Sequence, residues 1–331
     1  MTSPTTDPAA ELPGAVQTSL FRFMDAFEAF RPELYRYCRY LTRSPWDAED
    51  LAQDALARAF VTLGRMGEPP PNPRAWLFRV ASNLWIDEKR RARETAASET
   101  EPSAAYEPRA SREAAGTLIG RLAPRERVAV VLKDVFGLSL EEVAEALSTT
   151  TGTVKATLHR GRGKLADPEA AEPHAALALP AVLDAFCTAF NAQDLNGLTA
   201  LLLDTASVEV VGTHTDYGPA AAAKNAFFGM LFGAERMAVA GGGLEPAFTQ
   251  GVLPRSPRCE LRRHRGEPVL LLWYAHADGE FVRAFNRVEL DGERIAALKN
   301  YFYSPEAMAE LCSELDVPCR SNGYKHCLSG R

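Results

Sequence analysis

The sequence predicts two small all-α domains followed by a larger α+β domain, joined by linkers. Apolar residues recur with helical spacing from about residue 21 to 165, whereas the last third of the chain contains runs typical of β-strands. Two Ala- and Pro-containing stretches separate these patterns and favour flexible linkers. The predicted segments are a disordered leader at 1–19, all-α domains at 20–93 and 113–166, linkers at 94–112 and 167–179, an α+β domain at 180–304 and a tail at 305–331.

Charge is distributed unevenly along the 331 residues. The chain carries 37 Lys and Arg against 43 Asp and Glu, a net charge of −6. Residues 1–167 hold 23 charges of each sign, so the whole acidic surplus lies in 168–331. Domains that bind nucleic acid are usually basic, so the total argues against that function. The neutral half permits it, provided that its cations cluster on one surface.

Targeting signals and metal motifs are absent from the sequence. No run approaches the 18 apolar residues of a membrane-spanning helix, and the polar N-terminus lacks the basic and apolar regions of a signal peptide. We therefore expect a cytoplasmic protein with reduced cysteines. The six cysteines include no CxxC pair, so no zinc ribbon is indicated and no cofactor or metal is expected.

The first all-α domain contains two clear helix starts. Ser44 precedes Pro45, and Asn72 precedes Pro73, which are favoured pairs for the N-cap and first helical position. On the helix after Ser44, charged residues spaced by three and four share one face. These are Asp47, Asp50, Asp54 and Arg58, flanked by Glu49 and Gln53. A solvated surface is one interpretation of this face, and a surface for a protein partner is the other.

The helix after Asn72 mixes cations, amides and aromatic side chains along one stripe. Its members are Trp76, Arg79, Asn83, Asp87 and Arg90, with Lys89 beside them. Cations bind phosphates, while Trp and Asn side chains contact exposed bases, so this stripe suits single-stranded or melted DNA. Trp76 and the later Trp85 could equally be core residues.

The second all-α domain contains a helix-turn-helix pattern. Ser139 and Glu142 form a capping box that opens a short helix, the turn spans 148–150, and a second helix runs over 151–165. That second helix carries four cations and no acid, which favours the major groove over a generic helical hairpin. Base edges would face Thr151, Thr153, Lys155 and Thr157, and phosphates would face Arg160, Arg162 and Lys164. His159 completes the candidate −35 set. Gly161 and Gly163 weaken its last turns.

Three stretches together resemble the extracytoplasmic-function group of bacterial sigma factors. They are DAEDLAQDALARAF (47–60), NPRAWLFRVASNLWIDEKRR (72–91) and the helix-turn-helix from LAPRER to GRGKL (122–165). The resemblance implies that the first two form region 2, which docks on RNA polymerase and opens the −10 element, and that the third forms region 4, which reads the −35 element. The polymerase contacts it implies are Asp47, Glu49, Asp50, Leu51, Gln53 and Asp54. The family usually has Gly at Ser148 and Ser-Arg at 156–157, so base readout is expected to differ here.

The last part of the chain is similar to SnoaL-like domains. Its start, 180–212, predicts helices at 181–192 and 195–203 and then a strand. A helix near 219–232, loops at 241–243 and 254–258, and strands at 268–277, 280–290 and 293–303 follow. The resemblance implies an α+β cone with a pocket, and a sigma factor whose C-terminal extension regulates activity in cis. Departures from the family's elements lie at 212–218 and 304–308.

A regulator fused to a ligand-binding or catalytic domain is the alternative reading. His214 and Asp216 could form an acid/base pair, with Trp273, Arg283 and Phe285 lining a pocket. Because such pairs are common by chance, no catalytic residue is assigned and the chain is expected not to be an enzyme. The tail holds Cys312, Cys319, His326 and Cys327, which permit zinc binding or a redox switch, although packing of the tail on the sigma domains is favoured. Expected partners are the β′ and β subunits of core polymerase and promoter DNA, with no membrane.

Overall fold

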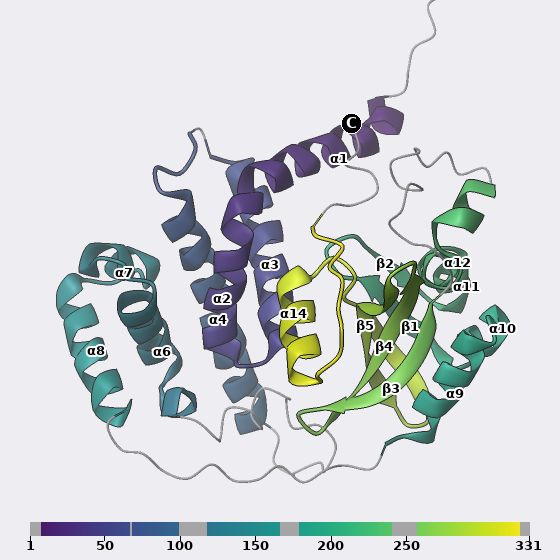
Figure 1. The fold of residues 1–331 in the computed structure, drawn as a ribbon. Helices are drawn as coiled ribbons and strands as arrows, with labels where there is room; N and C mark the ends of the chain where they lie inside the picture. The colour runs from purple at the N-terminus through teal and green to yellow at the C-terminus, as the bar shows by residue number, and fades with distance from the viewer. Residues whose placement is uncertain (1–7, 67, 99–117, 166–178, 240–256, 325–331) are drawn as a thin grey trace, which may run out of the picture. The chain divides into compact units, whose positions relative to one another are not determined.

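Two units make up the chain in the computed structural model, Met1–Glu172 and Pro173–Arg331, here called the N-terminal and C-terminal units. The structure describes residues 8–66, 68–98, 118–165, 179–239 and 257–324 (Figure 1). The predicted linker at 167–179, the predicted loop at 241–243 and the tail residues His326 and Cys327 lie almost wholly or wholly outside the described residues.

The N-terminal unit opens with a helical bundle that buries the apolar faces foreseen in the sequence. Its elements are α1 (Pro8–Phe27), the 3-10 turn η1 (Glu28–Phe30), α2 (Arg31–Thr42), α3 (Pro45–Leu63) and α4 (Pro73–Ser98). The predicted caps are confirmed: Ser44 Oγ accepts from the Asp47 N–H at 3.3 Å, and Asn72 Oδ1 accepts from the Ala75 N–H at 3.0 Å. Tyr37 and Trp85 are among the largest fully buried side chains.

The disordered leader predicted at 1–19 was wrong from residue 8 onward, because α1 begins at Pro8. Val16, Leu20, Phe23 and Phe27 keep helical spacing, so the helix that buries Phe23 and Phe27 extends upstream as one continuous element. The linker predicted at 94–112 was wrong over residues 94–98, because helix α4 continues to Ser98. The remainder of that predicted linker, 99–112, lies outside the described residues.

The second part of the N-terminal unit is a helix-turn-helix domain. It comprises η2 (Leu118–Arg121), α6 (Pro124–Val130), a π-helical turn η3 (Val131–Val135), α7 (Leu140–Ala146) and α8 (Thr151–Leu165). The capping box is confirmed, since Ser139 Oγ accepts from the Glu142 N–H at 3.1 Å and Glu142 accepts from the Ser139 N–H at 2.8 Å. Ser148 lies in the turn with a left-handed φ of 48°, the conformation that favours glycine.

Gly161 has a packing role that the sequence did not reveal. It is buried where α8 crosses α6, and a Cβ at this position would lie 2.9 Å from Val130 Cγ2. Helices α6 and α8 can therefore keep this close contact only while residue 161 lacks a side chain. A Cβ on Gly163, two residues on, would have no atom within 4 Å, so this second glycine faces open space.

We expect Gly161→Ala to lower the stability of the helix-turn-helix domain by about 1–3 kcal/mol, because the added methyl overpacks the α6–α8 contact. Gly163→Ala is the matched control and should raise stability by up to about 1 kcal/mol through helix propensity. Thermal unfolding followed by circular dichroism measures both. Equal effects of the two substitutions would contradict the packing role.

The C-terminal unit is built on a six-stranded mixed sheet with the order β2-β1-β6-β5-β4-β3. The strands are β1 (Leu202–Val210), β2 (His214–Tyr217), β3 (Arg258–His264), β4 (Glu267–His276), β5 (Gly279–Asp291) and β6 (Arg294–Asn300). The pair β1 and β6 is parallel, and the other neighbouring strands are antiparallel. The predicted α+β class is confirmed.

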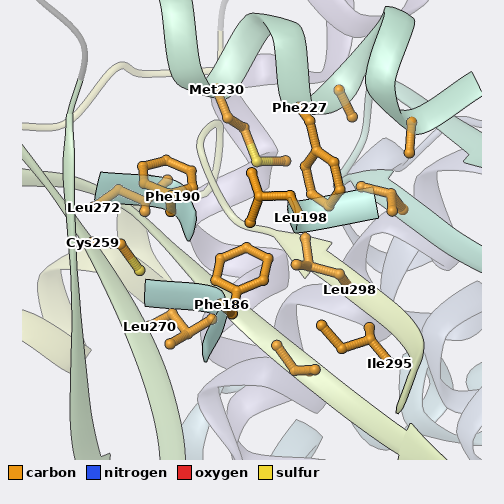
Figure 2. Close-up of a cluster of buried hydrophobic side chains, with 14 of the residues drawn as sticks. Phe186, Phe190, Leu198, Phe227, Met230, Cys259, Leu270, Leu272, Ile295 and Leu298 are labelled. Atoms are coloured by element: carbon orange, nitrogen blue, oxygen red, sulfur yellow. The ribbon is translucent and has the colours of Figure 1, made fainter. Parts of the chain in front are cut away.

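Helices cover both faces of this sheet. On one face lie α9 (Ala181–Asn191), α10 (Leu195–Ala200), α11 (Pro219–Lys224) and α12 (Ala226–Val239). Figure 2 shows the core beneath them, where Phe186, Phe190 and Phe227 meet Leu298 and Ile295. Helix α14 (Pro305–Glu314) packs against β5 with Met308, Leu311 and Cys312 buried.

Several predicted elements of this unit were wrong in detail. The helix predicted at 195–203 ends at Ala200, because Leu202 pairs with Ile295 of β6. The helix predicted at 219–232 is divided in two at Asn225. Strands β2 and β3 were not predicted, since the first is short and the second is rich in arginine.

The tail is joined to the C-terminal unit by backbone and side-chain hydrogen bonds. The Val282 N–H donates to Pro318 O at 2.9 Å, and the Arg320 N–H donates to Val282 O at 3.0 Å. Asn322 Nδ2 donates to the carbonyls of Arg283 and Phe302 at 2.7 and 2.9 Å. The described part of the tail therefore extends the sheet beside β5.

Candidate nucleic-acid interface

Helix α3 presents part of the acidic face predicted for polymerase. Asp54 is exposed, and Asp47, Asp50 and Gln53 are half-buried. Glu49 is only 1% exposed and forms a buried ion pair with Arg31 at 2.8 Å, while Gln53 Nε2 donates to Glu49 Oε1 at 2.8 Å. Leu51 is buried as well. The structure thus places the side chains of Glu49 and Leu51 in the bundle, and not on the predicted docking surface.

The predicted stripe on α4 also contains both exposed and buried side chains. Asn83 and Arg90 are exposed, and Asp87 and Lys89 are half-buried. Trp76 is 5% exposed, with its ring 6.1 Å from that of Phe27, so it occupies the core position that the sequence had left open. Trp85 is a core residue too, with the Arg127 guanidinium 5.1 Å from its ring centre.

Polar contacts join α4 to the helix-turn-helix domain. Arg79 pairs with Glu145 of α7 at 2.7 Å, and Asn72 Nδ2 donates to Glu142 at 3.0 Å. Arg74 donates to both oxygens of Glu33 and to Phe136 O. The hydrogen bond from Arg74 lowers the pKa of Glu33 despite its partial burial. The predicted −10 residue Arg79 therefore lies against the first helix of the helix-turn-helix.

Phe136 is the apolar centre of this contact. Its ring lies edge-on to Phe78 at 5.1 Å, to Tyr37 at 5.6 Å and to Tyr40 at 6.1 Å. Arg127 adds a buried hydrogen bond to Leu41 O at 2.6 Å. Burial lowers the pKa of Arg127 to about 10, so its guanidinium remains charged at neutral pH. Aromatic packing and charged hydrogen bonds thus hold the bundle and the helix-turn-helix domain together.

Most of the predicted −35 residues reach the surface of α8. Thr153, Lys155, His159, Arg160 and Arg162 are exposed, and Thr151 is half-buried. Thr157 is buried, and its hydroxyl donates to Thr153 O at 2.8 Å within the helix. The Thr157 side chain is therefore engaged within the helix and is not an exposed group that could contact a base.

A groove of about 650 Å³ lies beside this helix. Lys155, His159 and Arg162 line it together with Lys133, Leu140 and Leu158. Three positively charged or protonatable groups from α8 and the lysine from η3 suit a phosphate backbone. Sequence reasoning missed Lys133, although an isolated lysine in the apolar run VVLKDVF was a signal.

Acidic side chains hold the basic end of α8 in place. Arg162 donates to both oxygens of Asp134, at 3.0 and 2.5 Å, which raises the pKa of Arg162. Lys164 and Arg160 pair with Glu126 at 2.7 and 3.7 Å. Burial raises the pKa of Glu126, but the hydrogen bonds from Lys164 and the Ala123 N–H lower it by more. The carboxylates of Asp134 and Glu126 thus orient these exposed cations, although each exposed ion pair stabilises the domain only weakly.

The residues predicted for a C-terminal pocket are placed apart. Asp216 accepts from Asn225 Nδ2 and the Ala226 N–H at 2.8 and 3.0 Å, so it caps the start of α12. His214 lies 3.6 Å from Asp216 and is 41% exposed. These two belong to the edge strand β2, and two strands separate them from β5.

The other three pocket candidates lie on β4 and β5. Trp273 packs under the Arg258 guanidinium at 4.6 Å, and Arg283 Nε donates to Asn322 at 2.8 Å. Phe285 stacks on Tyr301 at 4.6 Å. Phe285 pairs with Leu271, between the core residues Leu270 and Leu272, so it faces the side of the sheet opposite the core in Figure 2.

Neither a metal-binding cluster nor a membrane span is found in the described residues. Among them, no group of three or more His, Cys, Asp or Glu side chains could hold a metal ion. No helix in that part of the chain combines the length and apolar character needed to cross a membrane.

Comparison with known proteins identifies the N-terminal unit. Residues 26–95 match Sigma-70 region 2, and residues 112–165 match Sigma-70, region 4. The ECF RNA polymerase sigma factor SigW of Bacillus subtilis is 30% identical over 162 residues, which cover 43% of this chain and 86% of SigW.

Two solved structures are similar over other shares of the chain. The extracytoplasmic function sigma factor SigJ of Mycobacterium tuberculosis has a TM-score of 0.29 and 22% identity, over 84% of this chain and 95% of SigJ. An NTF-2 like protein of unknown function from Burkholderia xenovorans LB400 has a TM-score of 0.24 and 14% identity, over 37% of this chain and 79% of that protein.

The sequence similarity carries the assignment, since both sigma regions are present in order and most of SigW is covered. The chain belongs to the ECF RNA polymerase sigma factors of the sigma-70 family.

Proposed function

We propose that this sigma factor docks on core polymerase through the exposed part of the α3 acidic face, contacts the −10 element through α4 and reads the −35 element through α8. The basic groove beside α8 is the observation that carries the proposal. It gathers Lys133, Lys155, His159 and Arg162 in a chain with an overall negative charge. Such a local concentration of cations supports binding to phosphates.

Promoter binding by α4 requires a change at its contact with α7. Arg79 is paired with Glu145, and Asn72 is bonded to Glu142, so these two side chains cannot contact DNA in the same geometry. The pair is partly exposed, and such pairs contribute about 0–1 kcal/mol each. Polymerase and promoter contacts can therefore replace them at low energetic cost.

The C-terminal unit is proposed to regulate these regions in cis, in the cytoplasm, and without catalysis. It is tethered to the N-terminal unit, has its own core and carries the acidic surplus of the chain. An acidic surface linked to a DNA-binding unit can repel DNA or compete for basic surfaces. Asp216 is engaged as a helix cap, which favours regulation over the acid/base alternative.

Footprinting with reconstituted polymerase tests the proposed promoter contacts. Core polymerase with the full chain should protect both promoter elements in footprints. Lys155→Ala and His159→Ala together should weaken protection at −35 while leaving core binding unchanged. Full protection by this double variant would contradict the role of α8.

Truncation near residue 175 tests regulation in cis. Removal of the C-terminal unit should raise or lower the transcript yield. Transcription from each promoter is compared with the full chain at equal occupancy of core polymerase. Identical yields at every promoter tested would reject regulation by this unit.

A further inference from the structure

Two cysteines lie in contact between α9 and the edge strand β3. Cys187 Sγ and Cys259 Sγ are 3.5 Å apart, although 72 positions separate them in the sequence. Cys187 is half-buried on α9, and Cys259 is buried on β3, next to Leu272 in its register. Figure 2 shows Cys259 directed into the core with Leu270 and Leu272.

The backbone around this contact is fixed by a neighbouring side chain. Asn191 Nδ2 donates to Cys259 O at 3.0 Å, and Asn191 Oδ1 accepts from the Cys259 N–H at 2.7 Å. Asn191 lies four residues after Cys187, so both point from the same face of α9. The amide therefore clamps Cys259 in place, and a shift of about 1.5 Å would bring the sulfurs to disulfide distance.

The two thiols differ in acidity. The hydrogen bond from Cys259 lowers the pKa of Cys187, in spite of burial and of the Asp184 and Glu260 carboxylates. The same contact, together with burial, raises the pKa of Cys259 well above its usual value. Cys187 is thus the more accessible sulfur and the better nucleophile, while Cys259, 3.5 Å away, lies within reach of an oxidised Cys187.

We propose that Cys187 and Cys259 form a reversible disulfide when a hydroperoxide reacts with this protein. The Cys187 thiolate attacks one peroxide oxygen, the O–O bond breaks, and a sulfenic acid forms while the leaving oxygen takes up the proton that the Cys187 thiol released on ionising. Cys259 sulfur then attacks the Cys187 sulfur, the S–O bond breaks, and hydroxide leaves as water with the Cys259 proton. With hydrogen peroxide, two thiols and one peroxide give one disulfide and two waters, and the sulfurs lose two electrons.

The bond would tie α9 to β3 and enclose α10, β1, β2, α11 and α12 in one covalent loop. A crosslink that closes a long loop restricts the unfolded chain. We therefore expect the melting temperature of the C-terminal unit to rise on oxidation and to return to its starting value after reduction.

Two other cysteines of the chain, Cys312 and Cys38, serve as comparisons for the reactivity of Cys187. Burial and the neighbouring Cys319 raise the pKa of Cys312 to about 12, so Cys312 is almost entirely protonated at neutral pH. Cys38 is fully buried, and its pKa is also raised. Both should react with peroxide more slowly than Cys187, because the thiolate is the reactive form.

Peptide mapping of the full chain tests the proposal. The protein is treated with hydrogen peroxide, the remaining thiols are alkylated, and crosslinked peptides are identified by mass spectrometry before and after dithiothreitol. A 187–259 crosslink that forms first and disappears on reduction is expected, together with a reversible rise in melting temperature. Cys187→Ser should abolish both effects, and Cys38→Ser should leave them unchanged.

Cys259→Ala serves as the second variant, with circular dichroism to verify folding. In this variant Cys187 should accumulate as sulfenic acid, trapped by dimedone. The proposal is overturned if Cys187 proceeds to sulfinic acid in the wild-type chain without the crosslink. It is also overturned if Cys312 and Cys319 crosslink at a peroxide dose that leaves Cys187 reduced.

Discussion

Replacement of Glu49 by alanine should lower the free energy of unfolding of the helical bundle by about 3–5 kcal/mol. Glu49 and Arg31 are 1% and 3% exposed and form an ion pair at 2.8 Å. Without the Glu49 carboxylate, the buried Arg31 guanidinium would lose this ion pair, and a buried charge deprived of its partner is far less favourable than the intact pair. Denaturant unfolding of a Trp273→Phe background measures the effect, because the other three tryptophans lie in the bundle.

A double variant separates loss of charge pairing from loss of packing. Arg31→Met with Glu49→Leu removes both charges and keeps most of the volume, so it should recover much of the stability. If Glu49→Ala changes stability by less than about 1 kcal/mol, the pair contributes little to the bundle and Glu49 is free to serve another role.

The charge reversal Asp50→Lys should weaken binding of the full chain to core polymerase by roughly 100-fold or more, since repulsion between like charges at an interface amounts to several kcal/mol. Asp50 lies half-exposed between Asp47 and Asp54 on the acidic face of α3. Labelled protein titrated with core polymerase and followed by fluorescence anisotropy gives the dissociation constant.

Glu68→Lys is the matched control for this reversal. Glu68 is exposed and follows α3, and its substitution makes the same change in net charge away from the α3 face. Core binding should therefore change little. Equal dissociation constants for Asp50→Lys and the wild-type chain would place the polymerase contact elsewhere, whereas equal weakening by both variants would indicate a general charge effect.

Local features of the fold could be predicted because their causes lie within a few residues. Ser44, Asn72 and Ser139 cap the helices that follow them, through contacts only three residues long. The Asp-Gly pairs at 278–279 and 291–292 join β4 to β5 and β5 to β6. The order of region 2 and region 4 was equally visible from their motifs.

Burial of polar site residues could not be predicted, because it depends on partners distant in the sequence. Glu49 has the same chemistry as Asp47 and Asp50, yet it is buried since Arg31 reaches it from another helix. Arg79 was a candidate for DNA contact by composition, and its partner Glu145 follows 66 residues later. Strand β3 alternates charged residues, and only its pairing with β4 defines it.

The parallel pairing of β1 with β6 has a consequence for biosynthesis. Leu202 pairs with Ile295, so β1 lacks one of its two neighbours until more than 90 further residues have been translated. At about 5–20 residues per second, this delay is roughly 5–20 s, and the N-terminal unit leaves the ribosome before it begins. Regions 2 and 4 are therefore synthesised ahead of the sheet, and the nascent chain passes through a period in which both sigma regions are complete while the C-terminal unit is still being made.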